Sequence, residues 1–149
     1  MEKEFVNYHI GRIVKIISIY NEKFLNKKFQ ELDLTTSQAR VLGYLFNNQD
    51  RNITTRDLEK HFDLSHPTLV GIIKRLHEKN FINYKDDPND KRCKYIEITV
   101  KTIKTSIEAK KILDLSEEVM SSGLSKEEIE NFKRISSKIF DNICEVIND

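Results

Sequence analysis

Cysteine, proline and glycine are all scarce in this chain, whose 149 residues include two Cys, two Pro and four Gly. Cys93 and Cys144 form neither a Cys-x-x-Cys pair nor a disulfide framework. We therefore expect reduced thiols that act as small packing residues in a cytoplasmic protein. The shortage of Gly and Pro leaves little room for linkers. We expect a mainly helical chain that folds as a single domain over residues 1–149.

Long apolar runs are absent as well. His9, Arg12 and Lys15 interrupt the N-terminal segment, which argues against a signal peptide or a membrane span there. The sequence therefore predicts a soluble, intracellular protein without a membrane partner.

The motifs of common catalytic sites are missing too. The sequence contains no Gly-rich phosphate loop and no Gly-x-Ser-x-Gly motif, and no pair of histidines has metal-ligand spacing near a cysteine. We predict no catalytic residues, no cofactor and no metal site. Metal ligands from separate segments that converge in a dimer remain an alternative.

Charge is unevenly distributed although the whole chain has a net charge of only +1. Residues 51–104 carry 12 Lys or Arg against 8 Asp or Glu, whereas residues 105–149 carry 6 against 10. The middle of the chain is therefore the part expected to face a polyanion. The alternative is an ordinary solvated surface.

Polar capping residues mark the expected helix starts. Thr35 and Gln38 form a capping box ahead of an apolar run, and residues 54–57 and 125–128 repeat the arrangement. Ser65 is the expected N-cap of a helix with Pro67 in its first turn, and Asn80 is its expected left-handed C-terminal cap. The predicted helices cover residues 5–31, 35–48, 54–62, 65–80, 99–122 and 125–146.

Two runs that alternate apolar and polar residues follow the fourth of these helices. Residues 81–84 and 93–98 predict an antiparallel pair of strands, with a charged hairpin tip at residues 86–92. Residues 52–53 could add a third, very short strand. Many surface hairpins are charged for solubility alone, but a charged hairpin directly after a short Ser-capped helix is typical of a winged helix-turn-helix.

Three segments carry recognisable motifs. They are Leu-Thr-Thr-Ser-Gln at residues 34–38, Ser-His-Pro-Thr-Leu-Val at residues 65–70, and Asp-Pro-Asn-Asp-Lys-Arg at residues 87–92. Together they resemble the MarR/SlyA family of winged-helix transcriptional regulators, although Asn80 stands where that family usually has Gly. The resemblance implies a mainly α fold with a small β-hairpin wing. Residues 34–100 would form the DNA-binding lobe, and residues 1–31 and 101–149 the dimerisation helices.

We expect the start of the helix at residues 65–80 to contact DNA. Its amide groups and positive dipole end suit a phosphate, while first-turn side chains can reach base edges in the major groove. Hydroxyl and imidazole groups can bond to bases, and Lys or Arg can neutralise phosphates. The candidate residues are Ser65, His66, Pro67, Thr68, Gly71, Lys74 and Arg75, with Thr55 and Arg56 from the preceding helix. For His66 the alternative is an exposed residue without a role.

The resemblance also assigns a role to the wing tip, where Asp90, Lys91 and Arg92 follow one another. It implies that Arg92 enters the minor groove while Asp90 holds the tip or the guanidinium in place. Narrow A/T-rich minor grooves attract arginine because they concentrate negative potential. The alternative is a surface ion pair worth less than about 1 kcal/mol.

The terminal helices carry more apolar surface than one small lobe can cover, and the resemblance implies an isologous homodimer formed by them. The candidate interface residues are Ile10, Ile13, Ile17, Phe132, Ile139 and Ile143. The resemblance further implies a small aromatic or phenolic effector. Its candidate residues are Tyr8, His9, Arg12 and Tyr44, where Arg12 offers a partner for a carboxylate. Interface packing and surface charge are the alternative for these four.

The predicted function is a dimeric regulator that binds a specific pseudopalindromic DNA sequence, represses transcription and is released by an effector. Two alternatives stay open. One is a winged helix that serves as a protein-interaction module, and the other is a helical dimer that binds a small ligand without specific DNA binding.

Overall fold

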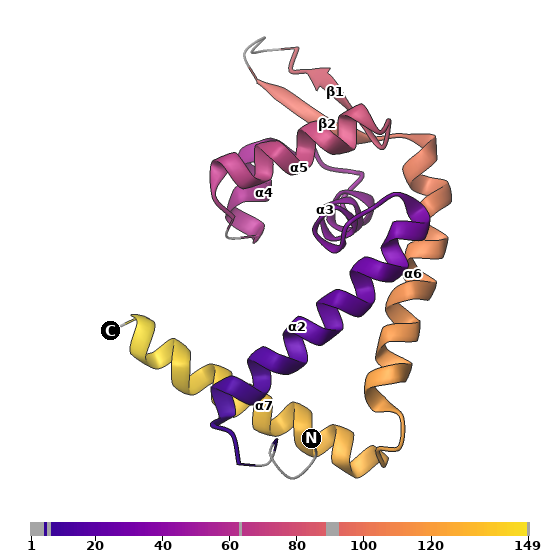
Figure 1. The fold of residues 1–149 in the computed structure, drawn as a ribbon. Helices are drawn as coiled ribbons and strands as arrows, with labels where there is room; N and C mark the ends of the chain where they lie inside the picture. Colours follow the sequence, from indigo (N-terminus) through magenta and orange to yellow (C-terminus); the bar gives the residue numbers. More distant parts are fainter. Residues whose placement is uncertain (1–4, 6, 63, 89–92, 149) are drawn as a thin grey trace. The chain divides into compact units, whose positions relative to one another are not determined.

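A computed structural model describes residues 5, 7–62, 64–88 and 93–148 (Figure 1). The chain forms two compact units, Met1–Asp114 and Leu115–Asp149, whose boundary falls inside a helix. The predicted mainly α fold with a β-hairpin wing is confirmed, whereas the extent of a single domain stays a prediction. The elements are α2 (Ile10–Phe29), the 3-10 helix η1 (Gln30–Leu32), α3 (Thr36–Asn47), α4 (Thr55–Phe62), α5 (His66–Glu78), β1 (Ile82–Asp86), β2 (Lys94–Ile98), α6 (Val100–Ser121) and α7 (Lys126–Asn148).

Capping boxes start α3 and α7 at the predicted residues. The amide of Gln38 donates to Thr35 Oγ1 over 3.2 Å, and the amide of Thr35 donates to Gln38 Oε1 over 3.1 Å. At α7 the amide of Glu128 donates to the Ser125 hydroxyl over 3.2 Å, and the amide of Ser125 donates to Glu128 over 2.7 Å. These bonds stabilise the carboxylate and lower the pKa of Glu128.

Left-handed residues end two helices. Asn80 has a φ of 59°, and the amides of Asn80 and Phe81 donate to the carbonyls of His77 and Leu76, each over 2.9 Å. This pattern is a Schellman motif, so Asn80 fills the role that Gly fills most often. Asp33 ends η1 in the same way with a φ of 56°. Lys79 joins the two turns, because its Nζ lies 3.0 Å from Asp33 Oδ1.

The first helix is not continuous as predicted. Residues 5–31 were expected to be helical, but residues 7–9 are not helical, and α2 begins at Ile10 after an extended His9. Only the C-terminal end of α2 enters the core, through Leu25 and Phe29, which are 5% and 1% exposed. In its first two turns Ile10, Val14 and Ile17 stay open to solvent, whereas Ile13 and Ile16 are half-buried.

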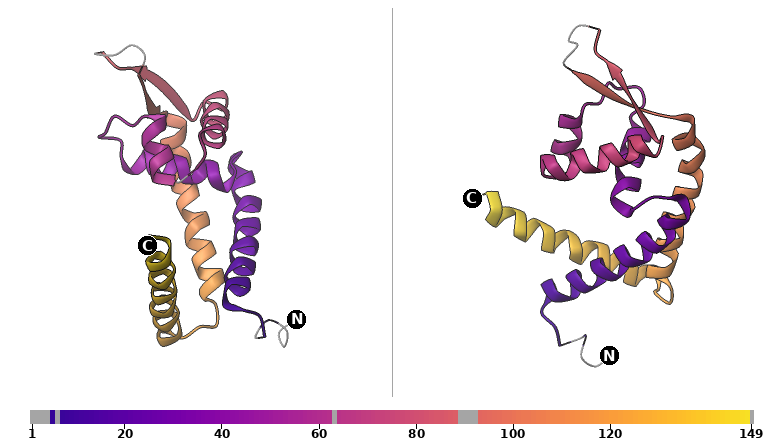
Figure 2. Two further views of the ribbon diagram at one scale, coloured as in Figure 1. Left: turned by 90° about the vertical axis from the view of Figure 1, so that its left-hand side faces the viewer. Right: turned by 45° about the horizontal axis from the view of Figure 1, so that its top comes forward.

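The hydrophobic core belongs to the winged-helix lobe of the first unit. Figures 1 and 2 show α3, α4 and α5 grouped near the C-terminal end of α2, with the hairpin beside them. Leu58, Leu69 and Leu76 are fully buried at its centre. The remaining buried hydrophobic residues are Leu25, Phe29, Leu34, Val41, Leu42, Leu45, Ile53, Ile73, Phe81, Ile82 and Ile96.

The wing hairpin pairs β1 with β2 in antiparallel register, from Ile82 opposite Ile98 to Asp86 opposite Lys94. The third strand that residues 52–53 suggested is not formed in the described part of the chain, where the sheet has two strands. The amide of Ile96 donates to the carbonyl of Ile53 over 2.8 Å. A single bond of this kind anchors the α3–α4 segment to the wing without extending the ladder.

Candidate nucleic-acid interface

The interface is built on α4, whose start is fixed by a third capping box. The amide of Thr54 donates to Asp57 Oδ2 over 2.9 Å, and the amide of Asp57 donates to Thr54 Oγ1 over 3.3 Å. The Thr54 hydroxyl also donates to this carboxylate, and these bonds lower the pKa of Asp57. The capping box places Thr55, half-buried, and Arg56, exposed, in the first turn of α4.

One face of α5 is buried and the opposite face is open. Leu69, Ile73 and Leu76 are 0%, 2% and 0% exposed, which fixes the rotation of the helix about its axis. This rotation leaves most of the predicted DNA-contacting side chains of α5 in solvent. The exposed candidates are Ser65, His66, Pro67, Thr68, Lys74 and Arg75.

Gly71 is the half-buried exception among the candidates of α5. A Cβ at this position would meet no atom within 4 Å apart from its own helix and chain neighbours. The glycine is therefore not required by packing, and the space beside it can admit part of a bound molecule.

Ser65 occupies the N-cap position with extended backbone angles, φ −63° and ψ 145°, but its side chain makes no capping hydrogen bond. The Ser65 hydroxyl lies 2.8 Å from the Thr68 hydroxyl instead. The position of the cap was predicted from the sequence, whereas this pairing was not. Because Ser65 does not occupy the first-turn amides, these groups can donate to a phosphate.

His66 has a partner that the sequence did not indicate. Its Nδ1 is hydrogen-bonded to Glu59 Oε1 on α4, with 71% of the His66 side chain and 25% of the Glu59 side chain exposed. The two residues are seven positions apart. Because they lie on different helices, this spacing predicts a contact only when the angle between α4 and α5 is known.

The basic side chains Lys74 and Arg75 of α5 are exposed, and Lys74 makes only a long ion pair within the helix. Lys74 Nζ lies 3.9 Å from Glu78 Oε1, with 75% of the Lys74 side chain exposed. Exposed pairs at this spacing contribute about 0.3–0.5 kcal/mol, so a phosphate can replace Glu78 at little cost. Arg75 is likewise exposed on the adjoining face.

Side chains tie the two strands of the wing together. The Tyr95 hydroxyl donates to Asp87 Oδ2, and this bond is the main reason that the pKa of Tyr95 is raised to about 12. Lys85 Nζ lies 2.9 Å from Glu97 Oε1 across the two strands. The wing-tip candidates Asp90, Lys91 and Arg92 lie outside the described residues.

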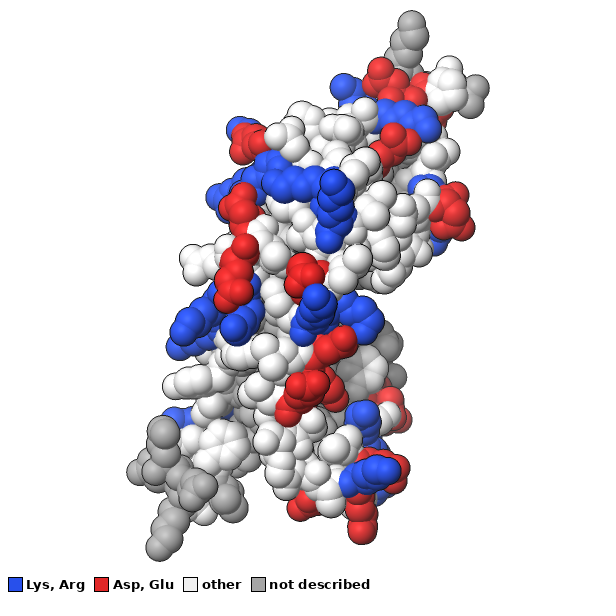
Figure 3. Space-filling model, turned by 90° about the vertical axis from the view of Figure 1, so that its right-hand side faces the viewer, with Lys and Arg blue, Asp and Glu red and all other residues white. Residues whose placement is uncertain are grey.

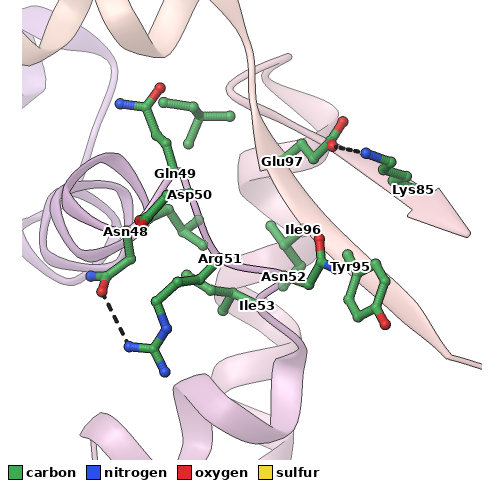
Figure 4. A pocket seen from close by; sticks show the side chains of 12 residues that line it. Asn48, Gln49, Asp50, Arg51, Asn52, Ile53, Lys85, Tyr95, Ile96 and Glu97 are labelled. Carbon is green, nitrogen blue, oxygen red and sulfur yellow. Dashed lines mark hydrogen bonds and ion pairs between the residues drawn. The ribbon is translucent and has the colours of Figure 1, made fainter. Parts of the chain in front are cut away.

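A cavity of about 250 Å³ lies between the α3–α4 segment and the wing (Figure 4). Arg51 and Asn48 line one side, joined by a bond of 3.4 Å, and the Lys85–Glu97 pair lines the other. Its polar groups come from loop and strand-edge positions that sequence periodicity does not bring together. Within the described residues, no group of three His, Cys, Asp or Glu side chains is placed to hold a metal ion.

The predicted effector residues fall into two contacts. The Arg12 guanidinium lies 3.8 Å from the centre of the Tyr8 ring, next to His9 at the start of α2. Tyr44 on α3 packs against the His61 ring, with centroids 4.0 Å apart. The end of α2 that packs in the core begins at Leu25, more than ten residues after Arg12. Each helical residue adds about 1.5 Å along the axis, so Arg12 lies well away from that core. Their joint role in effector binding stays a prediction.

Several of the predicted dimer residues present apolar surface to solvent. Ile10 and Ile17 are 60% and 41% exposed in the first unit. Phe132 and Ile143 of α7 are 62% and 53% exposed, and Ile13 and Ile139 are half-buried. The interface itself stays a prediction.

Charge on the face drawn in Figure 3 is mixed, with Lys and Arg side chains lying among Asp and Glu side chains. The local excess of basic residues in the middle of the chain is thus not gathered into one patch on this face. No described helix is long and apolar enough to span a membrane.

Comparisons with known proteins agree with this geometry. The MarR family model matches residues 32–92. MepR of Staphylococcus aureus, solved as a complex with DNA, is 27% identical, with a TM-score of 0.83 over 92% of this chain and 99% of MepR. A second MepR structure, described as a transcription regulator of the multidrug efflux pump MepA, has a TM-score of 0.75 at 27% identity over 91% of this chain and 99% of that one. The transcription regulator MarR from Oenococcus oeni is 27% identical, with a TM-score of 0.70 over 89% of this chain and 99% of its own.

Proposed function

The chain belongs to the MarR family of winged-helix transcription regulators, as its motifs predict, and on that premise we propose that it is a homodimeric repressor of a specific operator. As a member of a family of regulators it is not an enzyme. Three features have to be accounted for: the surface that contacts DNA, the second subunit and the release of the operator.

The observation that carries the proposal is the rotation of α5. Its buried leucines turn the Ser65 to Thr68 segment outward, at the amino end of a helix beside the wing. This is the placement of a helix that enters the major groove. The similarity to MepR, which was solved bound to DNA, supports the same use of this helix.

Most of the candidate residues have a role that their chemistry allows. His66 and Thr68 contact base edges in the major groove, and Lys74 and Arg75 contact phosphates. Thr55 and Arg56 contact phosphates from the start of α4. At the wing tip, Arg92 enters the minor groove with Asp90 and Lys91 beside it, a role carried over from the family resemblance.

A second copy of the chain completes the binding unit. The exposed apolar residues of α2 and α7 are numerous for a chain of this size, and burial of such a surface stabilises a dimer. Two α5 helices placed about 34–36 Å apart match one turn of duplex DNA. Half-sites at that separation form a pseudopalindrome.

Release of the operator follows from the same arrangement. A small aromatic acid bound near Tyr8 and Arg12 favours a dimer whose α5 helices have the wrong separation for DNA. The affinity for the operator falls by as much as the acid prefers this dimer to the DNA-binding one. Arg12 offers a bidentate partner for the carboxylate.

The alternative of a protein-interaction module is less well supported. A protein-docking helix presents an apolar face, and on α5 Val70 is the one large hydrophobic residue with more than a third of its surface exposed among the described positions. The polar groups that surround Val70 fit a base pair with its methyl and amino groups better than they fit an apolar groove.

Selection of bound sequences from random duplex DNA tests the proposal. Wild-type protein is expected to enrich an inverted repeat with half-site centres about 10 base pairs apart. A triple variant with His66, Thr68 and Lys74 replaced by Ala, matched to wild type in melting temperature, serves as the control and is expected to enrich nothing. Absence of any enriched sequence with the wild type would contradict the proposed function.

A further inference from the structure

The pairing of His66 with Glu59 joins the predicted base-contacting helix to the helix before it. Glu59 lies on α4 one residue after the fully buried Leu58, and three quarters of its side chain is covered. His66 is the first residue of α5, and most of its ring is in solvent. The largely covered Glu59 side chain thus bonds to one of the two ring nitrogens of the exposed His66.

The chemistry of the pair determines where the proton is. At pH 8 a glutamate is ionised, and an ionised carboxylate can only accept hydrogen bonds. The His66 Nδ1 that faces Glu59 must therefore carry the hydrogen. In a neutral ring the other nitrogen, Nε2, is then an acceptor.

The proposed function assigns the exposed part of His66 to the major groove, and the following inference rests on that function. We propose that Glu59 is a positioning residue, which fixes the His66 ring with Nδ1 protonated and presents Nε2 as a hydrogen-bond acceptor to a base. Glu59 itself does not touch the DNA. It determines which base is preferred by setting the tautomer and the orientation of its neighbour.

The preferred base follows from the pattern of groups in the major groove. Adenine and cytosine present an exocyclic amino donor there, whereas guanine O6 and thymine O4 are acceptors. An acceptor at Nε2 therefore selects adenine or cytosine at the position that His66 contacts. A ring held in the opposite tautomer would present a donor instead, which guanine, thymine and the N7 of adenine can all accept.

Two substitutions of Glu59 separate its charge from its hydrogen bond. Glu59→Gln removes the negative charge but keeps an oxygen that accepts from Nδ1, whereas Glu59→Leu removes both. Any gain in affinity from removing a negative charge near phosphates is expected in both variants. Loss of base preference is expected in Glu59→Leu alone.

The experiment combines two measurements at pH 8. Imidazole ¹⁵N shifts of the free protein, assigned with His66→Ala, report the tautomer and are expected to show hydrogen on Nδ1 in wild type and Glu59→Gln. Affinities for duplexes that differ at the position contacted by His66 are expected to favour adenine or cytosine by about five- to tenfold in those two proteins. In Glu59→Leu, matched in melting temperature, the preference is expected to fall below about twofold.

The possible results separate the inference from the proposed function. If wild type enriches no DNA sequence, the proposed function fails and the inference fails with it. If wild type enriches an inverted repeat but carries hydrogen on Nε2, or prefers guanine or thymine, the inference alone is wrong. It is also wrong if Glu59→Leu keeps or sharpens the preference, since Glu59 would then be irrelevant to His66 or would compete with the base.

Discussion

Side chains on the open face of α5 are expected to divide into two functional kinds. Thr68 is exposed in the first turn, where a hydroxyl reaches a base edge, whereas Lys74 lies further along the helix with a loosely held ammonium group. Thr68→Ala is expected to change which bases are preferred. Lys74→Ala is expected to weaken all duplexes by a similar factor and to reduce the slope of log K against log salt by about 1.

Titrations of both variants at several salt concentrations check this division. Glu78→Ala is a matched control for Lys74→Ala, because it breaks the same Lys74–Glu78 pair while keeping the positive charge. If Lys74→Ala altered base preference and left the salt slope unchanged, the roles assigned to this face would be wrong.

At the level of single residues, the sequence predicted the positions of helix caps but not the side-chain hydrogen bonds at the start of α5. The N-cap at Ser65 and the left-handed cap at Asn80 were predicted because their signals lie within a few residues. The hydroxyl pair of Ser65 with Thr68 and the bond between Glu59 and His66 were not predicted. The second of these depends on the angle between two helices, which local spacing does not encode.

The Schellman motif at the end of α5 gives a prediction at the scale of one element. Asn80 adopts a φ of 59°, a conformation that Asn tolerates and that other L-residues adopt at a cost of about 1–2 kcal/mol. Asn80→Ala is therefore expected to lower the free energy of unfolding by roughly 1 kcal/mol. Asn80→Gly, the residue usual in the family, is expected to be neutral or slightly stabilising.

Urea denaturation of the three proteins measures the effect. The carbonyl of Asn80 accepts from the Thr99 hydroxyl over 2.8 Å, and this bond is available to all three because it uses the backbone. Equal stability of the Ala and Gly variants would contradict the role of the left-handed cap.

The capping box of α4 predicts a dependence on pH. Hydrogen bonds from Thr54 lower the pKa of Asp57 below its ordinary value of 3.8, so the folded state favours the ionised form. The resulting stabilisation is complete above the ordinary value and is lost as the pH falls through the lowered one. Asp57→Asn is expected to be less stable than wild type by roughly 0.3–1 kcal/mol at pH 7, because it removes a negative charge from the first turn.

Melting temperatures of wild type and Asp57→Asn between pH 7 and about pH 3 test this dependence. The difference between the two proteins is expected to shrink towards the acid end, where Asp57 becomes protonated in the unfolded chain. A difference that grows as the pH falls would show that the carboxylate does not stabilise the start of α4.

Element boundaries show where local sequence signals are sufficient and where they fail. The capping boxes of α3, α4 and α7 were predicted in full, because each is formed by residues three positions apart. The first helix was predicted to be continuous over residues 5–31, but residues 7–9 interrupt it before α2 begins at Ile10, a break that apolar periodicity does not reveal. The third strand predicted at residues 52–53 does not form in the described part of the chain, because one hydrogen bond from the amide of Ile96 to the carbonyl of Ile53 does not make a ladder.

At the scale of the whole molecule, the proposed dimer depends on apolar surface that lies outside the lobe core. Ile143 of α7 is 53% exposed in the isolated chain, so a substitution there should leave the protomer folded. Ile143→Glu is expected to dissociate the dimer, because a carboxylate buried without a partner costs several kcal/mol. Affinity for an inverted repeat is expected to fall, since one lobe keeps only half of the contacts.

Sedimentation velocity and DNA titration of the same samples check this prediction. Ser137→Glu, at another exposed position on α7, adds the same charge away from the apolar stripe and is expected to remain dimeric. A folded, monomeric Ile143→Glu protein with undiminished affinity would show that the second subunit is not needed for binding.

The central claim is that two copies of α5, held at a fixed separation, bind two half-sites on one face of the duplex. The most direct measurement is the stoichiometry and affinity of wild type on the selected inverted repeat, compared with the same duplex after insertion of about five base pairs between the half-sites, roughly half a helical turn. The expected result is two chains per unmodified duplex and a loss of at least about tenfold in affinity after the insertion. One chain per duplex, with an affinity that the insertion does not change, would contradict the claim.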